Sequence, residues 1–298
     1  AATEVTRTVN VVDTFAPNTY FVKAGGNNNG GLSEENAFTT VNNAVVAASD
    51  GDTITIVGAI NQSGQVGIGK SISFVGQSDA TITGTGATNR LYNISEAGKT
   101  ISFTDVIFKD NTGATANGSV FNTTQGGTLA FTNCVFSGNS SVSTGGGGAI
   151  YVNNASAVLT ITGCTFYNNS SGNATNNGQG GAIMLLNSSA SSTITNSTFF
   201  DNKITRSDGN FGASVRVNND GKVTISNSLS YNNKADSGAG AGSGFNASPD
   251  ATLNVLNSIV DFTNNTDTST GSNLTADLSS SNLFFDASDG FVKYTAAP

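Results

Sequence analysis

Few residues of this 298-residue chain could carry out acid–base chemistry, and none of them is a histidine. General acid–base work at a sugar needs two positioned carboxylates, or a carboxylate beside a cation or a tyrosine. The one cluster of mixed charge comprises Asp201, Lys203, Arg206 and Arg216. We assign no catalytic residue and keep these four as the only alternative candidates. The other interpretation of the cluster is a solvated edge of loosely paired charges that discourages aggregation.

A second set of residues is better suited to binding. Aromatic residues recur at one position of three successive repeats: Tyr167, Phe200 and Tyr231. Because side chains alternate along a strand, these residues point outward while Phe166 and Phe199 before them point inward. Stacked on neighbouring coils, they would form a flat apolar stripe about 10 Å long. We predict that this stripe binds a sugar or a partner domain, unless a loop from the preceding turn covers it.

Both sets of residues are positioned by a repeated motif. It reads apolar–x–Asn–small–x–aromatic–x–x–Asn, followed by a polar loop and Gly-(Ala/Ser)-apolar. Its copies begin at Phe103, Phe131, Ile161, Ile194 and Ile225. The matching glycines are Gly118, Gly148, Gly181, Gly212 and Gly242. A fixed period of about thirty residues is typical of stacked supersecondary units in a solenoid.

Each repeat predicts short strands and no helix. Val, Ile, Thr and Phe alternate with polar residues, which indicates strands with one buried face. We therefore predict an all-β parallel β-helix of about eight coils. The apolar column Phe103, Phe131, Ile161, Ile194, Ile225 and Val255 should lie inside. The column Asp105, Asn133, Gly163, Asn196, Asn227 and Asn257 should form a turn ladder of stacked amides.

The ends of an open stack of strands must be covered. We predict a single domain over residues 1–298, with an N-terminal cap at 20–52, coils at 53–281 and an irregular apolar plug at 282–298. A helix at about 36–48 would place Phe38, Val41, Val45 and Ala48 on the first coil. The chain stops at Pro298 without a polar tail, so we expect it to be part of a longer protein.

Charge and cysteine content exclude several function classes. Only 11% of residues are charged, and the net charge is −8 with no basic patch, so nucleic acid is not an expected partner. No apolar run is long enough to form a transmembrane segment. The two cysteines, Cys134 and Cys164, are too few for a zinc site without histidine. We predict no metal and no cofactor.

Cys134 and Cys164 occupy the same position of adjacent repeats, and Ser197, Ser228 and Ser258 continue the column. One interpretation is a disulfide between the two thiols. The other is a pair of small buried side chains. The serines favour the second, since the column accepts any small residue.

The motifs resemble those of right-handed parallel β-helix surface proteins with polymorphic outer-membrane protein repeats. That family has paired Gly-Gly-Ala-Ile and Phe-x-x-Asn motifs. They occur here at 147–150 and 180–183, and at 108–111, 136–139, 166–169 and 199–202. The resemblance covers roughly residues 100 to 245. It implies a right-handed β-helix displayed on a bacterial surface and names no ligand.

These observations favour a non-catalytic module of a bacterial adhesin-like protein, located extracellularly, on the cell surface or at the outer membrane. Its expected partner is a protein or glycan of a host or neighbouring cell, and it could also serve as a stalk. The alternative is a β-helix that binds or degrades polysaccharide as a lyase or hydrolase. A third interpretation is a spacer of which no face binds anything.

Overall fold

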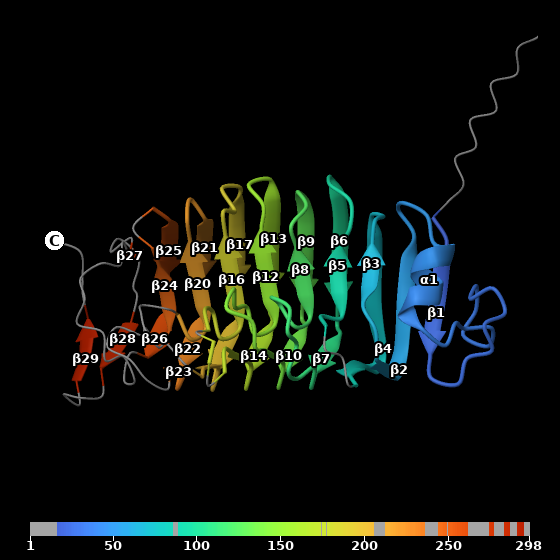
Figure 1. The fold of residues 1–298 in the computed structure, drawn as a ribbon, viewed down its shortest axis with the longest axis horizontal. Helices are drawn as coiled ribbons and strands as arrows, with labels where there is room; N and C mark the ends of the chain where they lie inside the picture. The colour runs from blue at the N-terminus through green and yellow to red at the C-terminus, as the bar shows by residue number, and fades with distance from the viewer. Residues whose placement is uncertain are drawn as a thin grey trace, which may run out of the picture.

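The computed structural model is an all-β parallel β-solenoid of about seven turns with one short helix (Figure 1). It describes residues 17–85, 89–173, 175–176, 178–205, 212–235, 244–248 and 250–261, and the backbone of three later strands. The predicted fold class is confirmed. We predicted about eight coils; among the described residues, seven coils contribute a strand to the second sheet. The first sheet extends past them at both ends.

Three sheets run along the rod, and Figure 1 shows their strands side by side. The first contains β1 (Thr19–Lys23), β2 (Thr53–Gln62), β4 (Ile72–Gly84), β6 (Lys99–Thr104), β7 (Ile107–Lys109), β9 (Gly127–Thr132), β10 (Val135–Ser137), β13 (Ala157–Thr162), β14 (Thr165–Tyr167), β17 (Ser191–Thr195), β18 (Thr198–Phe200), β21 (Lys222–Ser226), β22 (Leu229–Tyr231), β25 (Thr252–Leu256), β26 (Ile259–Asp261), β27 (Leu274–Ala276), β28 (Leu283–Asp286) and β29 (Phe291–Tyr294). The second contains β3 (Val66–Ile68), β5 (Tyr92–Ile94), β8 (Phe121–Thr123), β12 (Ile150–Asn153), β16 (Ile183–Leu186), β20 (Val215–Asn218) and β24 (Phe245–Ala247). The third contains the two-residue strands β11 (Ser140–Ser141), β15 (Ser170–Ser171), β19 (Lys203–Ile204) and β23 (Lys234–Ala235).

The core consists of columns of identical or similar apolar residues. The predicted column from Phe103 to Val255 is buried throughout. Phe136, Phe166 and Phe199 are fully buried, and their rings stack at centroid distances of 4.6 and 4.8 Å. These distances match the spacing of adjacent strands, so each ring packs directly on the equivalent ring of the next coil.

Two columns of left-handed residues turn the chain at each coil. One is the predicted turn column, in which Asn196 has a φ of 51° and Asn227 a φ of 50°. The other contains Asp110, Gly138, Asn168, Asp201 and Asn232, with φ between 49° and 63°. Asn, Asp and Gly occupy both columns because they tolerate this backbone conformation better than other residues.

The hydrogen-bonded amide ladder is not where we predicted it. Asn196 and Asn227 are turn residues, but their side chains are exposed. The ladder is formed instead by the last Asn of the repeat, at Asn139, Asn169, Asn202 and Asn233, which are at most 1% exposed. Each amide nitrogen donates to the next amide oxygen, at 3.0 Å from Asn139 to Asn169, from Asn169 to Asn202 and from Asn202 to Asn233.

The glycine motif turns a loop over the second sheet. Gly147 and Gly180 have φ values of +68° and +59°, and a Cβ on either would come within 2.3 Å of the carbonyl oxygen three residues later. Strand register aligns Phe121 with Ile150, so Gly118 is equivalent to Gly147 rather than to Gly148. Our match of Gly118 with Gly148 and Gly181 was therefore wrong by one residue. At 147–150 and 180–183 the turn requires the first glycine, because of the two glycines in each motif only the first is left-handed.

The column of Cys134 and Cys164 is a column of hydrogen-bond acceptors. Cys164 Sγ accepts from the Cys134 backbone N–H at 3.3 Å, and Ser197 Oγ accepts from the Cys164 N–H at 3.2 Å. Both cysteines are free and buried. The contact with the Cys164 thiol, together with burial, raises the pKa of Cys134. The structure thus agrees with small buried side chains rather than a disulfide.

The N-terminal cap contains the helix α1 (Val41–Ala47), which begins later than the predicted residue 36. Thr40 caps it by accepting from the Asn43 N–H at 3.2 Å. Phe38 instead pairs in extended conformation with β1, a strand that we did not predict: its N–H donates to the Phe21 carbonyl at 2.8 Å. Phe38, Val41, Val45 and Ala48 are buried, as predicted for the lid.

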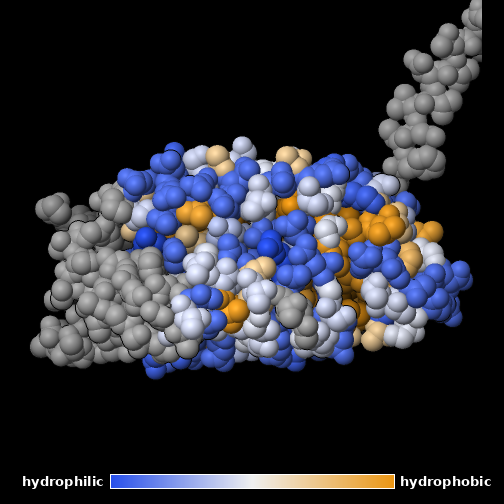
Figure 2. Space-filling view, viewed as in Figure 1, coloured by the Kyte–Doolittle hydropathy of each residue, from blue (hydrophilic) through white to orange (hydrophobic). Residues whose placement is uncertain are grey.

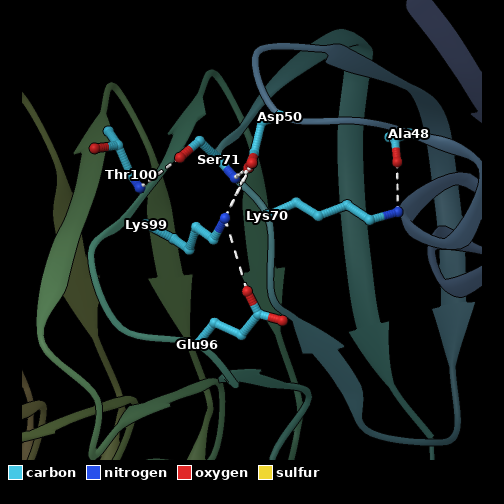
Figure 3. Close-up of polar contacts among 7 residues, drawn as sticks. All are labelled: Ala48, Asp50, Lys70, Ser71, Glu96, Lys99 and Thr100. Carbon is cyan, nitrogen blue, oxygen red and sulfur yellow. Dashed lines mark hydrogen bonds and ion pairs between the residues drawn. The ribbon is translucent and has the colours of Figure 1, made fainter.

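A polar network ties α1 to the first three coils (Figure 3). Lys70 Nζ donates to the carbonyl oxygens of Val45 and Val46, at 2.9 and 3.0 Å, and to that of Ala48. A cation at this place stabilises a helix C-terminus. Asp50 accepts from the Ser71 N–H at 2.6 Å and from Lys99 Nζ at 3.0 Å, and so joins the starts of three successive coils.

We expect the network at Asp50 to be lost in acid. The Ser71 N–H, followed by Lys99, lowers the pKa of Asp50 below 3.8. A carboxyl with a lowered folded-state pKa stabilises the fold fully above its unfolded-state pKa, and this contribution disappears as pH falls through the folded-state value. Asp50→Asn should therefore lower the thermal midpoint at pH 7, and the difference from the parent should shrink as the pH falls through the lowered pKa of Asp50.

The matched control is Glu34→Gln, whose carboxylate lies in the same cap at 3.8 Å from Lys23. It should change the midpoint less than Asp50→Asn at pH 7. A difference between Asp50→Asn and the parent that stays constant down to pH 2 would contradict the assignment.

The predicted plug at 282–298 lies partly outside the described residues. Of its backbone, β28 pairs parallel with β26 and antiparallel with β29. In the last pairing, β29 runs in the opposite direction to β28. Such a reversal is one way to terminate a run of parallel strands.

Candidate binding surface

The structure places Tyr167, Phe200 and Tyr231 in one column on β14, β18 and β22. Their rings stack at centroid distances of 5.0 and 5.2 Å, with interplanar angles of 3° and 6°. Tyr231 is 38% exposed, and Tyr167 and Phe200 are half-buried. We call these three residues the aromatic stripe.

The orientation of the rings limits what the aromatic stripe can contact. Parallel rings at this separation overlap face to face, so both faces of Phe200 are turned toward its neighbours. The surface therefore presents ring edges and the two hydroxyls of Tyr167 and Tyr231. We predicted a flat apolar stripe that binds a sugar or a partner domain. The observed ring geometry favours edge contacts and hydrogen bonds over stacking on a flat face. Within the aromatic stripe, a planar ligand could stack on the outer ring faces of Tyr167 and Tyr231, which form the two ends of the column.

Apolar side chains extend the aromatic stripe. Register places Leu229 beside Thr198 and Ile259 beside Leu229, in the column next to the rings. Ile259 is 40% exposed and Leu229 half-buried. Exposed apolar groups that gather in one place tend to mark contact surfaces.

A polar rim follows the aromatic stripe at the next turn. Asp201 directly follows Phe200 and accepts from the Asn232 amide. Lys203 and Lys234 are paired in register on β19 and β23. An apolar centre with a charged rim is the usual anatomy of a protein contact surface.

The three catalytic candidates that the structure describes do not form one cluster. Asp201 holds a left-handed turn with a φ of 54°, next to Lys203 along the chain. Arg216 instead lies in the second sheet, 6% exposed, where it donates to the Asn246 and Asn218 side chains. Burial lowers the pKa of Arg216 to about 10. Arg206 lies outside the described residues.

Arg216 points away from the core but is buried. Its burial does not fit the other interpretation of the cluster, a solvated edge of loosely paired charges. Its column contains Tyr151 and Met184, which are also buried. The glycine loops cover them: a Cβ on Gly147 would lie 3.1 Å from that of Tyr151. A loop that crosses the outer face of a sheet is not visible in the local pattern of the sequence.

A hollow lies between the start of α1 and the turn from β2 to β3. It is lined by residues that include Val41, Ile60 and Val66 together with the amides of Asn61 and Gln62. Figure 2 shows hydrophobic residues gathered at this end of the rod. The Gln62 amide is already engaged, because it donates to the Leu91 carbonyl at 3.0 Å and accepts from Tyr92 at 2.8 Å. This amide is a structural bridge rather than a binding group.

Two further properties follow from the described residues. No helix among them is long and apolar enough to span a membrane. Nor do they bring together three or more Cys, Asp or Glu side chains that could hold a metal ion.

Comparison with known proteins gives no match to a family model, a curated protein or a solved structure. The chain is thus defined by its fold as a parallel β-solenoid. The resemblance to polymorphic outer-membrane protein repeats rests on its two motifs alone.

Proposed function

We propose that this chain is an extracellular, surface-displayed module of a larger bacterial adhesin-like protein, and that it works by contact rather than by turnover. The observation that supports this most is the aromatic stripe, where three aromatic side chains stack at an exposed place beside Leu229 and Ile259. Its partner is a protein or glycan on a host or neighbouring cell.

The low charge of the chain supports a role outside the cell. Ser, Thr, Asn and Gly are abundant in the sequence, and only 11% of residues are charged. The stack of coils also gives a rod whose contact surface is rigid. A rigid surface loses little conformational entropy when it binds.

The carboxylates support binding over polysaccharide cleavage. In the column of Asp110 and Asp201, both acids adopt the left-handed backbone of a turn. They are three coils apart, or about 14 Å at the spacing of parallel strands. A retaining or inverting pair of carboxylates needs at most about 9.5 Å.

The test is to incubate the chain with neutral and acidic polysaccharides and with intact bacterial and host cells. Bound protein is measured by sedimentation, and new reducing or unsaturated ends are measured in the supernatant. We expect protein in the pellet and no new ends. Turnover that disappears in Asp201→Asn or Lys203→Ala would contradict the proposal and favour a lyase or hydrolase.

A further inference from the structure

A regular array of hydroxyls lies on the outer face of the first sheet. It consists of Thr160 and Thr162 on β13, Thr193 and Thr195 on β17, and Thr224 and Ser226 on β21, which are in direct register. Between the two residues of each pair, an Ile points into the core. We call these six residues the threonine grid. On β9, Thr132 extends one of its columns.

The threonine grid is partly exposed and uncharged, and contacts of Thr195 hold one of its pairs in place. Thr193 is exposed and the other five are half-buried. Thr195 Oγ1 lies 3.3 Å from Thr162 Oγ1 and 3.4 Å from the Ile161 carbonyl oxygen. A β-branched side chain has few rotamers, so these contacts fix the position of both the hydroxyl and the methyl group.

The dimensions of the grid follow from the fold. Stacked rings on neighbouring coils lie 4.8 Å apart at Phe166 and Phe199 and 5.0 Å apart at Tyr167 and Phe200. Along a strand, two residues span about 6.6 Å. The grid therefore repeats at about 4.8 Å along the rod and about 6.6 Å across it.

Ice has nearly the same dimensions. With an O–H···O distance of about 2.75 Å, tetrahedral geometry places second-neighbour oxygens about 4.5 Å apart and repeats the lattice about every 7.3 Å along its layer axis. The mismatch along the rod is roughly 0.3 Å per coil, which stays below about 1 Å over three coils. Across the rod it is roughly 0.7 Å, and it does not accumulate because only one step is made.

We propose that the threonine grid binds ice. A neutral lattice of water has no charge to pair with, and the grid presents none. Its hydroxyls can replace lattice waters, while its methyl groups occupy the gaps between them. This activity does not depend on the aromatic stripe, which lies on β14, β18 and β22 beyond a left-handed turn.

The full chain tests the proposal in two measurements. One is partition of labelled chain into slowly grown ice, and the other is the shape of single ice crystals. Thr193→Lys places a charged side chain in the centre of the grid. The control is Ala155→Lys, which adds the same charge at an exposed turn residue outside the grid.

We expect the parent and Ala155→Lys to enter ice and shape crystals, and Thr193→Lys to lose partition at least tenfold with unchanged circular dichroism. Should Thr193→Lys fail to fold, Thr162→Lys takes its place. Exclusion of the folded parent from ice, or equal partition of the grid variant and the control, would overturn the proposal. Neither result would bear on cell or glycan binding.

Discussion

Asn169→Ala is expected to lower the free energy of unfolding by about 3–5 kcal/mol, since each buried polar group left unpaired costs about 1–3 kcal/mol. The Asn169 amide nitrogen donates to the Phe136 carbonyl at 2.9 Å and to Asn202 Oδ1 at 3.0 Å. Its oxygen accepts from the backbone and side-chain nitrogens of Asn139, at 3.1 and 3.0 Å. The substitution thus removes four hydrogen bonds from a fully buried position.

The matched control is Asn196→Ala. Asn196 is exposed, and its substitution costs only the preference of Asn for left-handed backbone, which is about 1 kcal/mol. Urea denaturation followed by circular dichroism compares the two variants. Because a stack of repeats need not unfold in a single step, hydrogen exchange at the coils around Asn169 should locate the loss. Equal losses in both variants would contradict the assignment of the ladder.

The core could be predicted from the sequence because its period is fixed. Once Phe136, Phe166 and Phe199 are placed inside by strand alternation, the thirty-residue repeat stacks them. The same alternation placed Tyr167 and Phe200 outside, so the column of the aromatic stripe was predicted. The orientation of the rings in the aromatic stripe could not be predicted, because ring orientation depends on side-chain torsions that the coil spacing selects.

The amide ladder was misplaced for a physical reason. Strand alternation puts Phe166 inside and Tyr167 outside, and would put Asn169 outside as well. Asn168, between Tyr167 and Asn169, has a left-handed backbone conformation. This conformation turns the chain and points the Asn169 side chain inward. Two columns rich in Asn occur in each repeat, and the sequence does not show which of them is buried.

The burial of Arg216 depends on parts of the chain far from its own strand. Its immediate neighbours Val215 and Val217 point into the core, so alternation predicts an exposed arginine. Gly212 lies over this face, where a Cβ on it would approach the Asn246 Cβ to 3.1 Å. Packing between a loop and the adjacent coil therefore overrides the local pattern.

Replacement of both tyrosines of the aromatic stripe is expected to abolish binding to cells or glycans. Buried aromatic anchors at an interface cost about 2 kcal/mol or more when truncated, which is roughly thirtyfold in affinity for each. Tyr167→Ser and Tyr231→Ser remove both hydroxyls and both end faces of the stack. The core should be unaffected, because these side chains lie outside it.

The control is the double variant Leu32→Ser and Val75→Ser. These side chains are 63% and 36% exposed and lie outside the aromatic stripe. The control also removes exposed apolar surface, so a loss of non-specific hydrophobic adsorption would affect both variants alike.

The role of the aromatic stripe is tested by titrating fluorescently labelled chain onto the cells that bind it most strongly. We expect saturable binding by the parent and by the Leu32→Ser, Val75→Ser control, and no measurable binding by the correctly folded Tyr167→Ser, Tyr231→Ser variant. Undiminished binding by that variant would contradict the claim that this solenoid works through its aromatic stripe.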